Sequence, residues 1–496
     1  MAGQIADYKD FLLSGSLEED IALFKEIFKK DAILRVKRIS ARNTVPFDCA
    51  LVYMDGMVDS EQLNDAVIKP VITVDKPKNT ETLADFICEQ ILFARDVKKV
   101  NNIAKILEGV LYGEALLLID KSKVALSIDV KGWRTRGISE PSDERILGGP
   151  REGFEEAALL NIAMLRRKLI TPDLCIEMQR VGKRTDTMVF VCYLGSLSNK
   201  RTVKEIKKRI SEIDIDGILD VNYITEQIRD NKYSLFKTSG TTERPDVVAA
   251  RLLEGRIAII VDGTPVVATV PYLFSENFQS DEDYYQSFLY SSVGRMLRYF
   301  CFFITVCVPA IFVSISAFHR ELLPTSFLIS VMQLRAGVPF SPFVETVGMI
   351  LIFEILREAG IRTSQSLGHA ISIVGGLVVG QAAVEARIIG APTLIVVALS
   401  GIAGLMLPRL KSAVFYLRII FVLLAAVIGL YGVVSGLAVL LIYVLSLKSF
   451  GTDYTVSLTK ANFQSLKDTL WRAPWSYMKT RPLFNRNIKR KKDHPQ

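Results

Sequence analysis

The sequence predicts an α/β soluble N-terminal region of two subdomains, followed by an α-helical polytopic membrane domain. Three observations support this fold class. Through about residue 290, short alternating runs and helix-like patterns follow one another, with charges spread throughout. From residue 299 to 446 long apolar stretches dominate. From residue 447 the chain is basic, with eleven Lys or Arg and three Asp, and this net charge of +8 equals that of the whole 496-residue chain.

We expect five segments along the chain. The first α/β subdomain covers residues 1–130, and a polar linker covers 131–149. The second α/β subdomain covers 150–290, and a transmembrane domain of four to six membrane segments covers 291–446. A basic cytoplasmic tail, 447–496, completes the chain. Beside a membrane domain, such a tail is expected to contact anionic lipid and not nucleic acid.

Turn residues and periodicity predict the elements of the two subdomains. Ser16 is expected to cap a first helix, and residues 49–56 alternate as a strand that ends in Asp-Gly. Apolar runs around Lys-Ser-Lys predict a hairpin at 114–130, and Asp-Gly predicts another at 255–271. A helix is expected at 153–169. Further helical patterns occur at 60–68, 81–95, 101–112, 202–213 and 219–229.

The apolar stretches differ in length and in charge, and therefore in how well each could span a bilayer. Residues 299–318 form about 30 Å of uncharged helix, which is long enough. Residues 322–340 are a weak span or a re-entrant or interfacial segment. Residues 414–446 form either one tilted helix or two short limbs that break near a glycine. If the N-terminal region and the tail are both cytoplasmic, the number of spans is even. The other apolar stretches that could span the bilayer are 344–362, 371–390 and 392–407. The glycines near which 414–446 could break are Gly429, Gly432 and Gly436.

Two charged or polar patterns lie inside these apolar stretches. Charges within a bilayer are costly unless they are paired or hydrated. The first set consists of Glu345, Glu354, Arg357 and Glu358. These charges either form intrahelical pairs on a helix that lies at the membrane interface, or they line a vestibule or ion path. The second set shares one helical face at i, i+4, i+7 and i+11, and it consists of Val374, Val378, Gln381 and Glu385. In a ring, that face would form a valine constriction above a polar mouth; in one subunit it would be tight packing.

Other features exclude several function classes. The six cysteines form no C-x-x-C pair, and with three histidines a metal site is not expected. The N-terminus carries acids where a signal peptide has an apolar run. Nucleophile-elbow, Walker A and zinc-protease motifs are absent, so we expect neither an enzyme nor a cofactor.

Several longer motifs together resemble the A subunits of spore germinant receptors, the GerA family. The resemblance covers nearly the whole chain in the family's order. The sequence departs from the pattern at Gly148, where a basic residue is usual, and after residue 451, where prolines are common. The motifs are "KGWRTRGISEPSDERILGGPREGF", "RLLEGRIAIIVDGTP" (251–265), "DEDYY" (281–285), "REAGIR" (357–362), "SIVGGLVVGQAAVEA" (372–386) and "SFGTDY" (449–454).

The resemblance implies a multi-pass protein of the spore inner membrane, with its N-terminal domain and tail on the core side. It implies a transporter-like B subunit and a C-type lipoprotein as partners. It also implies a homo-oligomeric ring, a pentamer, that forms a nutrient-gated cation channel, with an amino-acid or sugar germinant sensed through the B subunit. A ring would make the face of Val374 and Val378 pore-lining. A related protein encoded with the spoVA operon shares this architecture, and it stays an alternative.

One alternative function and one loop complete the predictions. Broken helices near Pro339 also suit a solute transporter that works by alternating access. The stretch "GGPREGF" lacks the spacing of a phosphate-binding loop, so we interpret it as a corner that contacts the other subdomain or a neighbouring subunit. Arg151 is expected to pair with an acid such as Asp143 or Glu144, or with the next subunit. The corner residues are Gly149, Pro150, Arg151 and Glu152.

Overall fold

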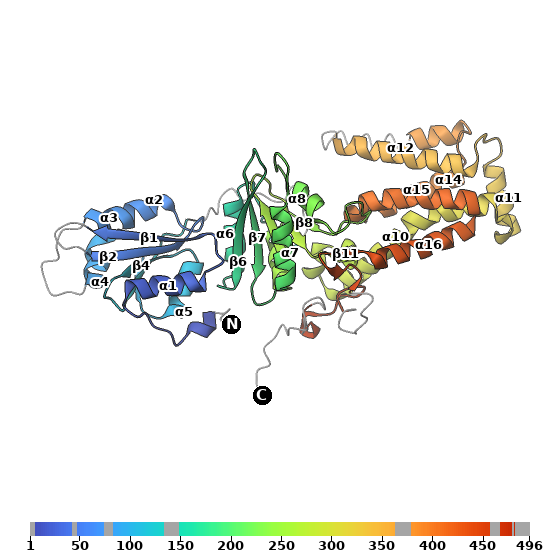
Figure 1. The fold of residues 1–496 in the computed structure, drawn as a ribbon. Helices are drawn as coiled ribbons and strands as arrows, with labels where there is room; N and C mark the ends of the chain where they lie inside the picture. The colour runs from blue at the N-terminus through green and yellow to red at the C-terminus, as the bar shows by residue number, and fades with distance from the viewer. Residues whose placement is uncertain are drawn as a thin grey trace.

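The computed structural model describes residues 5–41, 47–73, 83–132, 148–362, 378–456, 467–478 and 481. Two α/β units and one helical unit follow one another along the long axis of the molecule (Figure 1). This arrangement confirms the predicted fold class of an α/β region in two parts followed by an α-helical region.

The first α/β unit is built on a five-stranded antiparallel sheet with the order β1-β2-β4-β5-β3. Successive residues of β2 are buried on opposite faces, because side chains alternate along a strand. Ala50 and Val52 pack under α1 and α5, whereas Cys49 and Leu51 pack under α2–α4 on the other face. The strands are β1 (Leu34–Ala41), β2 (Phe47–Met54), β3 (Val97–Val100), β4 (Ala115–Ile119) and β5 (Ala125–Ile128).

The helices of this unit agree with the predicted periodicity in position but not in every detail. The predicted hairpin at 114–130 is confirmed by the pairing of β4 with β5. Ser16 occupies the N-cap of α1, but its side chain makes no cap bond; Asp20 instead accepts from the Ser14 amide at 3.0 Å. The helices are η1 (Ile5–Tyr8), α1 (Leu17–Ile27), α2 (Ser60–Gln62), η2 (Leu63–Ile68), α3 (Lys69–Thr73), α4 (Leu83–Phe86), η3 (Ile87–Ile91) and α5 (Ile103–Leu111).

The second α/β unit has the same strand order in its own sheet, β6-β7-β9-β10-β8. Helices α6 and α9 pack on one face, and α7 and α8 pack on the other. The predicted hairpin at 255–271 is confirmed as β9 and β10. The strands are β6 (Leu174–Val181), β7 (Thr187–Leu194), β8 (Gly240–Thr242), β9 (Ile257–Val261) and β10 (Val267–Val270), and the helices are α6 (Ala158–Lys168), α7 (Lys200–Ser211), α8 (Val221–Ile228) and α9 (Pro245–Leu253).

The predicted helix start at residue 153 is wrong, because α6 begins at Ala158. The preceding residues are held extended by tertiary bonds that periodicity does not report. Asp262, in the β9–β10 turn, accepts from the Ala158 amide at 3.0 Å. The Asn161 side chain accepts from the Glu155 amide at 2.8 Å and donates to the Glu155 carbonyl at 2.6 Å.

The two α/β units share one continuous hydrophobic core. The segment before β1 also extends the second sheet, because the Ala32 amide donates to the Ile176 carbonyl at 2.9 Å. Beside this bridge, Arg166 of α6 forms a buried ion pair with Asp31 of the first unit. The units are therefore fixed against each other by packing, backbone pairing and a buried charge pair.

The helical unit consists of long helices that run side by side, while α11 crosses their far end (Figure 1). Residues 414–446 form two helices that meet at Gly429, whose φ of +67° an L side chain rarely adopts. The second predicted alternative, two limbs, is therefore confirmed. The helices are α10 (Phe288–Ala317), α11 (Thr325–Leu334), α12 (Pro342–Arg362), a helix at 378–385, α14 (Ala391–Leu405), α15 (Lys411–Ile428) and α16 (Leu430–Ser446).

Within the described part of the chain, two helical segments are long and apolar enough to cross a membrane, namely Phe288–Ala317 and Pro408–Ile428. Three shorter apolar helices accompany them: α11, α14 and α16. The chain returns after α16 to the end of the helical unit that touches the second α/β unit. There the Phe274 amide donates to the Tyr454 carbonyl at 2.9 Å, beside a short hairpin of β11 (Lys448–Ser449) and β12 (Thr452–Asp453).

Candidate functional site

The helix at 378–385 carries polar side chains on an unpacked face. Val378 is 55% exposed, Gln381 and Glu385 are exposed too, and Gln381 donates to Glu385 at 2.9 Å. The opposite face is packed, since a Cβ on Gly380 would lie 3.3 Å from Leu394 of α14. Small residues on that face let the neighbouring helix approach closely. Val374, the first member of the predicted face, lies outside the described residues.

A largely apolar groove of about 700 Å³ runs between α12, this helix and α14. Gln381 and Glu385 are the polar side chains on its wall. The same two residues are therefore both exposed and next to a space that no described side chain fills.

Glu345 is a fully buried anchor between three helices. It accepts from Arg335 at 2.6 Å, from the Gly390 amide at 2.9 Å and from the Thr393 hydroxyl at 2.8 Å. These bonds fix the start of α12 against the end of α11 and the start of α14. Arg335 and Thr393, which sequence reasoning did not assign to the site, satisfy the charge that made Glu345 notable.

Glu354 and Arg357 form an intrahelical pair on α12. Glu354 also lies 3.8 Å from Arg418 of α15. Arg418 is buried and donates to Ser400 of α14 at 3.4 Å, so four polar side chains join three apolar helices. Arg418 was missed, although a lone Arg within a long apolar run was the signal that could have found it.

Glu358, the last of the predicted vestibule charges, lies near the end of α12 and is half exposed. It pairs with Arg362 at 2.9 Å and lies 3.7 Å from Lys411 at the start of α15. The intrahelical pairs of the interfacial interpretation are thus present for Glu354 and Glu358, and both groups also reach α15.

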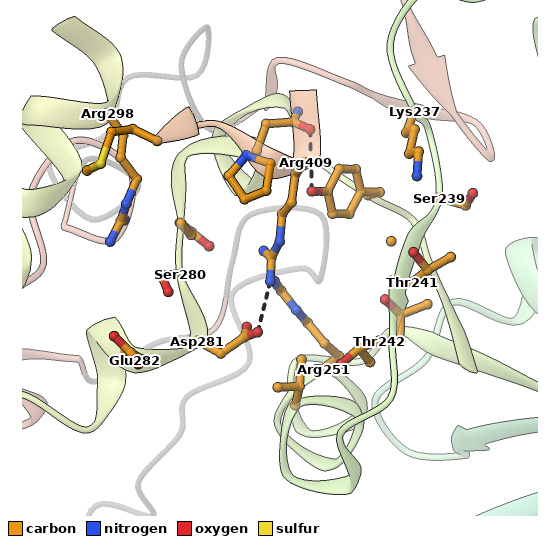
Figure 2. Close-up of a pocket in the computed structure, with 18 residues that line it drawn as sticks. Lys237, Ser239, Thr241, Thr242, Arg251, Ser280, Asp281, Glu282, Arg298 and Arg409 are labelled. Carbon is orange, nitrogen blue, oxygen red and sulfur yellow. Dashed lines mark hydrogen bonds and ion pairs between the residues drawn. The ribbon is translucent and has the colours of Figure 1, made fainter. Parts of the chain in front are cut away.

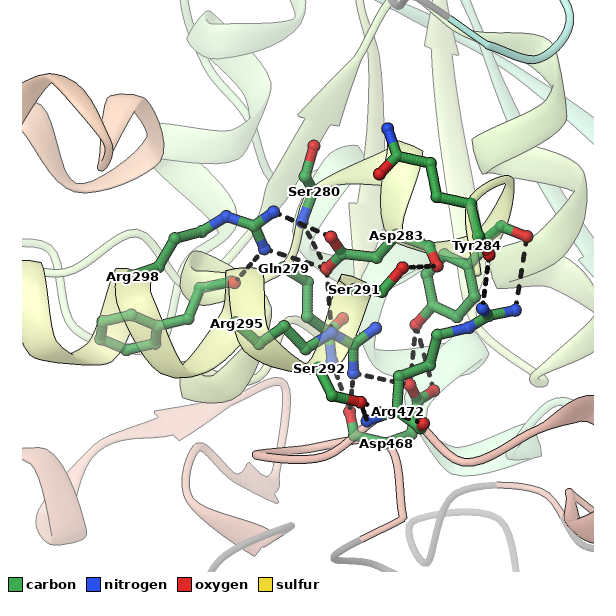
Figure 3. A network of polar contacts seen from close by, with 12 residues as sticks. Gln279, Ser280, Asp283, Tyr284, Ser291, Ser292, Arg295, Arg298, Asp468 and Arg472 are labelled. Carbon is green, nitrogen blue, oxygen red and sulfur yellow. Dashed lines mark hydrogen bonds and ion pairs between the residues drawn. The ribbon is translucent and has the colours of Figure 1, made fainter. Parts of the chain in front are cut away.

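A second polar cluster lies where α10 leaves the second α/β unit (Figure 3). Asp283 is buried between Arg295 at 2.9 Å and Arg298 at 2.8 Å. Arg295 continues to Asp468 at 2.8 Å, and Tyr284 donates to the same carboxylate at 3.0 Å. Burial alone would raise the pKa of Asp283, but its ion pairs with Arg298 and Arg295 lower that pKa below its usual value.

Next to this cluster is a half-enclosed polar cavity of about 650 Å³, which we call the junction pocket (Figure 2). Its walls come from β8 and α9, from the two 3₁₀ turns η4 (Phe274–Phe278) and η5 (Asp281–Tyr284), and from the turn between α14 and α15. Four cations and two carboxylates line it: Lys237, Arg251, Arg298, Arg409, Asp281 and Glu282.

The "GGPREGF" corner contacts the second α/β unit. Gly149 has a φ of +122°, and the Pro150 carbonyl accepts from Arg244 at 3.1 Å. Glu152 accepts from Lys168 at 2.7 Å and lies 3.7 Å from Arg167, so it meets the C-terminal end of α6. The partners predicted for Arg151, Asp143 and Glu144, lie outside the described residues.

Among the described residues, no group of three or more His, Cys, Asp or Glu side chains is arranged to hold a metal ion. The geometry instead defines a class of protein: a two-part α/β domain with a shared core, joined through a charged junction to an apolar helical unit with buried ion pairs.

Comparisons with known proteins identify the family. The family model described as Bacillus/Clostridium GerA spore germination protein matches residues 22–484. "Spore germination protein KA" of Bacillus subtilis (strain 168) is 39% identical over 475 residues, which cover 95% of this chain and 87% of that protein. "Uncharacterized membrane protein YfkQ" of the same organism is 37% identical over 437 residues, covering 87% and 84%. This chain belongs to the GerA family of spore germination proteins.

A solved structure is also similar to part of the chain. It is the crystal structure of the N-terminal domain of the A subunit of the Bacillus megaterium spore germinant receptor GerK3. It is 32% identical, and the similarity covers 53% of this chain and 97% of that one with a TM-score of 0.43.

Proposed function

We propose that this chain is a membrane-spanning A subunit of a germinant receptor and that it oligomerises into a nutrient-gated cation channel in the spore inner membrane. Two segments of sufficient length and apolarity support the membrane placement. The second α/β unit and residues 448–454 meet at one end of the helical unit. That meeting supports placing the N-terminal region and the tail on the same, core-facing side.

The single observation that carries the channel proposal is the exposed face of helix 378–385. Gln381 and Glu385 cannot face lipid without a penalty of several kcal/mol, because nothing in hydrocarbon replaces their hydration. A ring of subunits, a pentamer by family resemblance, would place both side chains in water around an axis. Val378, one turn away, would then narrow the pore at an apolar level that gates by dewetting.

The same resemblance supports the proposed partners. A transporter-like B subunit would bind the amino-acid or sugar germinant, and a C-type lipoprotein would complete the receptor. The two α/β units are fixed to each other through Arg166 and Asp31, so they would move as one body against the helical unit when the receptor is triggered.

The test is cation conductance of the purified receptor in a planar bilayer. Val378→Ser should make the channel leak without germinant, because a hydroxyl stabilises water at the constriction. Val427→Ser is the matched control, since Val427 is 73% exposed on α15 and should remain silent. Closed channels with Val378→Ser, or saturable solute uptake by single subunits, would count against the channel and favour alternating access.

A further inference from the structure

We propose that the junction pocket binds the headgroup of an anionic phospholipid and that an acyl chain of this lipid lies along α14. The inference rests on the proposed membrane placement, and it places the lipid headgroup in the junction pocket, apart from Gln381 and Glu385 of the proposed pore.

The first observation is the chemistry of one pocket wall. Lys237, Ser239 and Thr241 line the pocket from β8 and the segment that leads into it (Figure 2). Among the described residues the Lys237 ammonium has no carboxylate within ion-pair distance, while its side chain is exposed. An ammonium beside two hydroxyls is a set of donors that suits phosphate oxygens.

The facing wall adds guanidinium groups that are already held in place. Arg409 is positioned by Asp281 at 2.9 Å, and Arg298 is positioned by Asp283 at 2.8 Å. A guanidinium has five N–H donors, and the ion pair of Arg298 uses only some of them. Asp281 and Glu282 also line the pocket and would accept from hydroxyls. A headgroup with a phosphate and free hydroxyls, such as phosphatidylglycerol, matches both kinds of partner.

The second observation is an apolar path that ends at the mouth of this pocket. Ile395, Leu399, Ile402 and Met406 are all exposed on α14 and its last turn, at i, i+4, i+7 and i+11. They therefore form one stripe about 16 Å long, and Ile395 and Ile402 of this stripe also border the apolar groove beside helix 378–385. Met406 itself lines the pocket, so the apolar stripe meets the polar cavity directly. An acyl chain on the stripe would bring its own phosphate to the pocket.

The third observation is the position of the pocket. Its lining residues come from the α14–α15 turn and from the second α/β unit, so it lies where the apolar helices meet that unit. Under the proposed topology this level is the core-facing leaflet. Basic pockets at the cytoplasmic ends of membrane helices are suited to anionic headgroups.

The experiment measures binding of phosphatidylglycerol with a fluorescent acyl chain to the full chain purified in detergent. Unlabelled phosphatidylglycerol should displace the probe at lower concentration than phosphatidylcholine. Lys237→Ala should weaken binding by about fivefold, the effect of one cation near a phosphate. Lys232→Ala, an exposed lysine nearby that does not line the pocket, should leave binding unchanged.

A second variant tests the acyl path. Ile402→Ser should weaken binding of phosphatidylglycerol, whereas Val427→Ser on α15 should not. Equal binding by both lysine variants, or by both serine variants, would overturn the proposal. Displacement by glycerol 3-phosphate as effective as by phosphatidylglycerol would overturn it in favour of a free phosphate. A disulfide-linked dimer of Leu399→Cys that excludes the probe would overturn it in favour of a second copy of the chain.

The lipid and channel proposals fail separately. A receptor that conducts normally but shows no preference for phosphatidylglycerol would refute only the lipid site. A chain that binds phosphatidylglycerol as expected but forms no conducting assembly would refute only the channel.

Discussion

The Arg409 guanidinium, in the turn between α14 and α15, lies 2.9 Å from the Asp281 carboxylate of η5. The same guanidinium donates to the Glu276 carbonyl of η4 at 3.2 Å. Glu276 is in turn held by Arg251 at 2.9 Å and by Arg256 at 2.5 Å, both in the second α/β unit. One arginine therefore ties a turn of the helical unit to the charged core of the neighbouring unit.

Arg409→Ala should loosen this connection without unfolding either unit. Hydrogen bonds to charged groups contribute about 1.5–3 kcal/mol each, so local opening at η4 and η5 should become more frequent. Amide hydrogen exchange is the measurement, and faster exchange is expected at residues 274–284 with no change in β1 and β2. Arg320→Ala removes an exposed arginine at the far end of α10 and should leave the same amides unaffected. Equal exchange in both variants would show that Arg409 does not connect the units.

Arg166→Ala should destabilise the α/β region by about 3–5 kcal/mol, because it leaves the Asp31 carboxyl inside the core without its ion-pair partner. Thermal unfolding of the purified chain should show the loss. The double variant Asp31→Leu with Arg166→Met should recover most of it, since neither charge then remains buried. The surface pair offers a control: Arg35→Ala breaks an exposed contact with Asp55 and should cost at most about 1 kcal/mol. If Arg166→Ala lowers the thermal stability no more than Arg35→Ala does, the buried pair does not have the role assigned to it.

Local patterns predicted the elements well where local physics decides them. Lys-Ser-Lys between apolar runs predicts the hairpin at 114–130, Asp-Gly between apolar runs predicts the one at 255–271, and both are present. Helix α6 was placed five residues too early, because Asp262 and Asn161 hold the preceding residues extended. Periodicity registers which residues are apolar, but it does not register a hydrogen bond from a distant turn.

The sequence shows which charged residues in the apolar stretches need partners, but it does not show which residues the partners are. Glu345 and Glu354 were notable because a carboxylate in an apolar stretch needs a partner, but the partners Arg335 and Arg418 follow only from helix packing. The junction cluster joins Asp283 to Arg295, which are close in sequence, and Arg295 to Asp468, which is 173 residues away. Charge spacing alone does not select such a pair from the many carboxylates of this chain.

Gly429→Ala should destabilise the α15–α16 turn. The residue has a φ of +67° and ψ of −146°, a positive-φ region that is essentially restricted to glycine and costs an L residue on the order of 1–3 kcal/mol. The added Cβ would also lie 2.7 Å from the His319 ring. Gly348→Ala is the matched control on α12, where a Cβ meets no atom within 4 Å and helix propensity should add stability. Thermal unfolding in detergent should therefore move down for the first variant and not for the second.

Asp283→Asn should remove a pH-dependent part of the stability of the junction. The folded-state pKa of Asp283 is lowered from 3.8 because the ion pairs with Arg298 and Arg295 outweigh its burial. A carboxyl with a lowered folded pKa stabilises the fold fully above its unfolded pKa, about 4, and loses this contribution as the pH falls through the folded value. The contribution should thus be constant from about pH 7 to pH 5 and decline below about pH 4.

The measurement is the difference in Tm between the unaltered chain and Asp283→Asn across that range. The difference should be largest near neutral pH and should shrink in acid, because both proteins then carry a neutral side chain between the two arginines. The titration of Asp468 is common to both proteins and cancels in the difference, as far as its coupling through Arg295 is unchanged. Asp453→Asn, in the exposed β12, should give a small difference that does not vary with pH. A difference for Asp283→Asn that stays constant into acid would mean that the arginines are held by the shape of the site and not by the charge of the carboxylate.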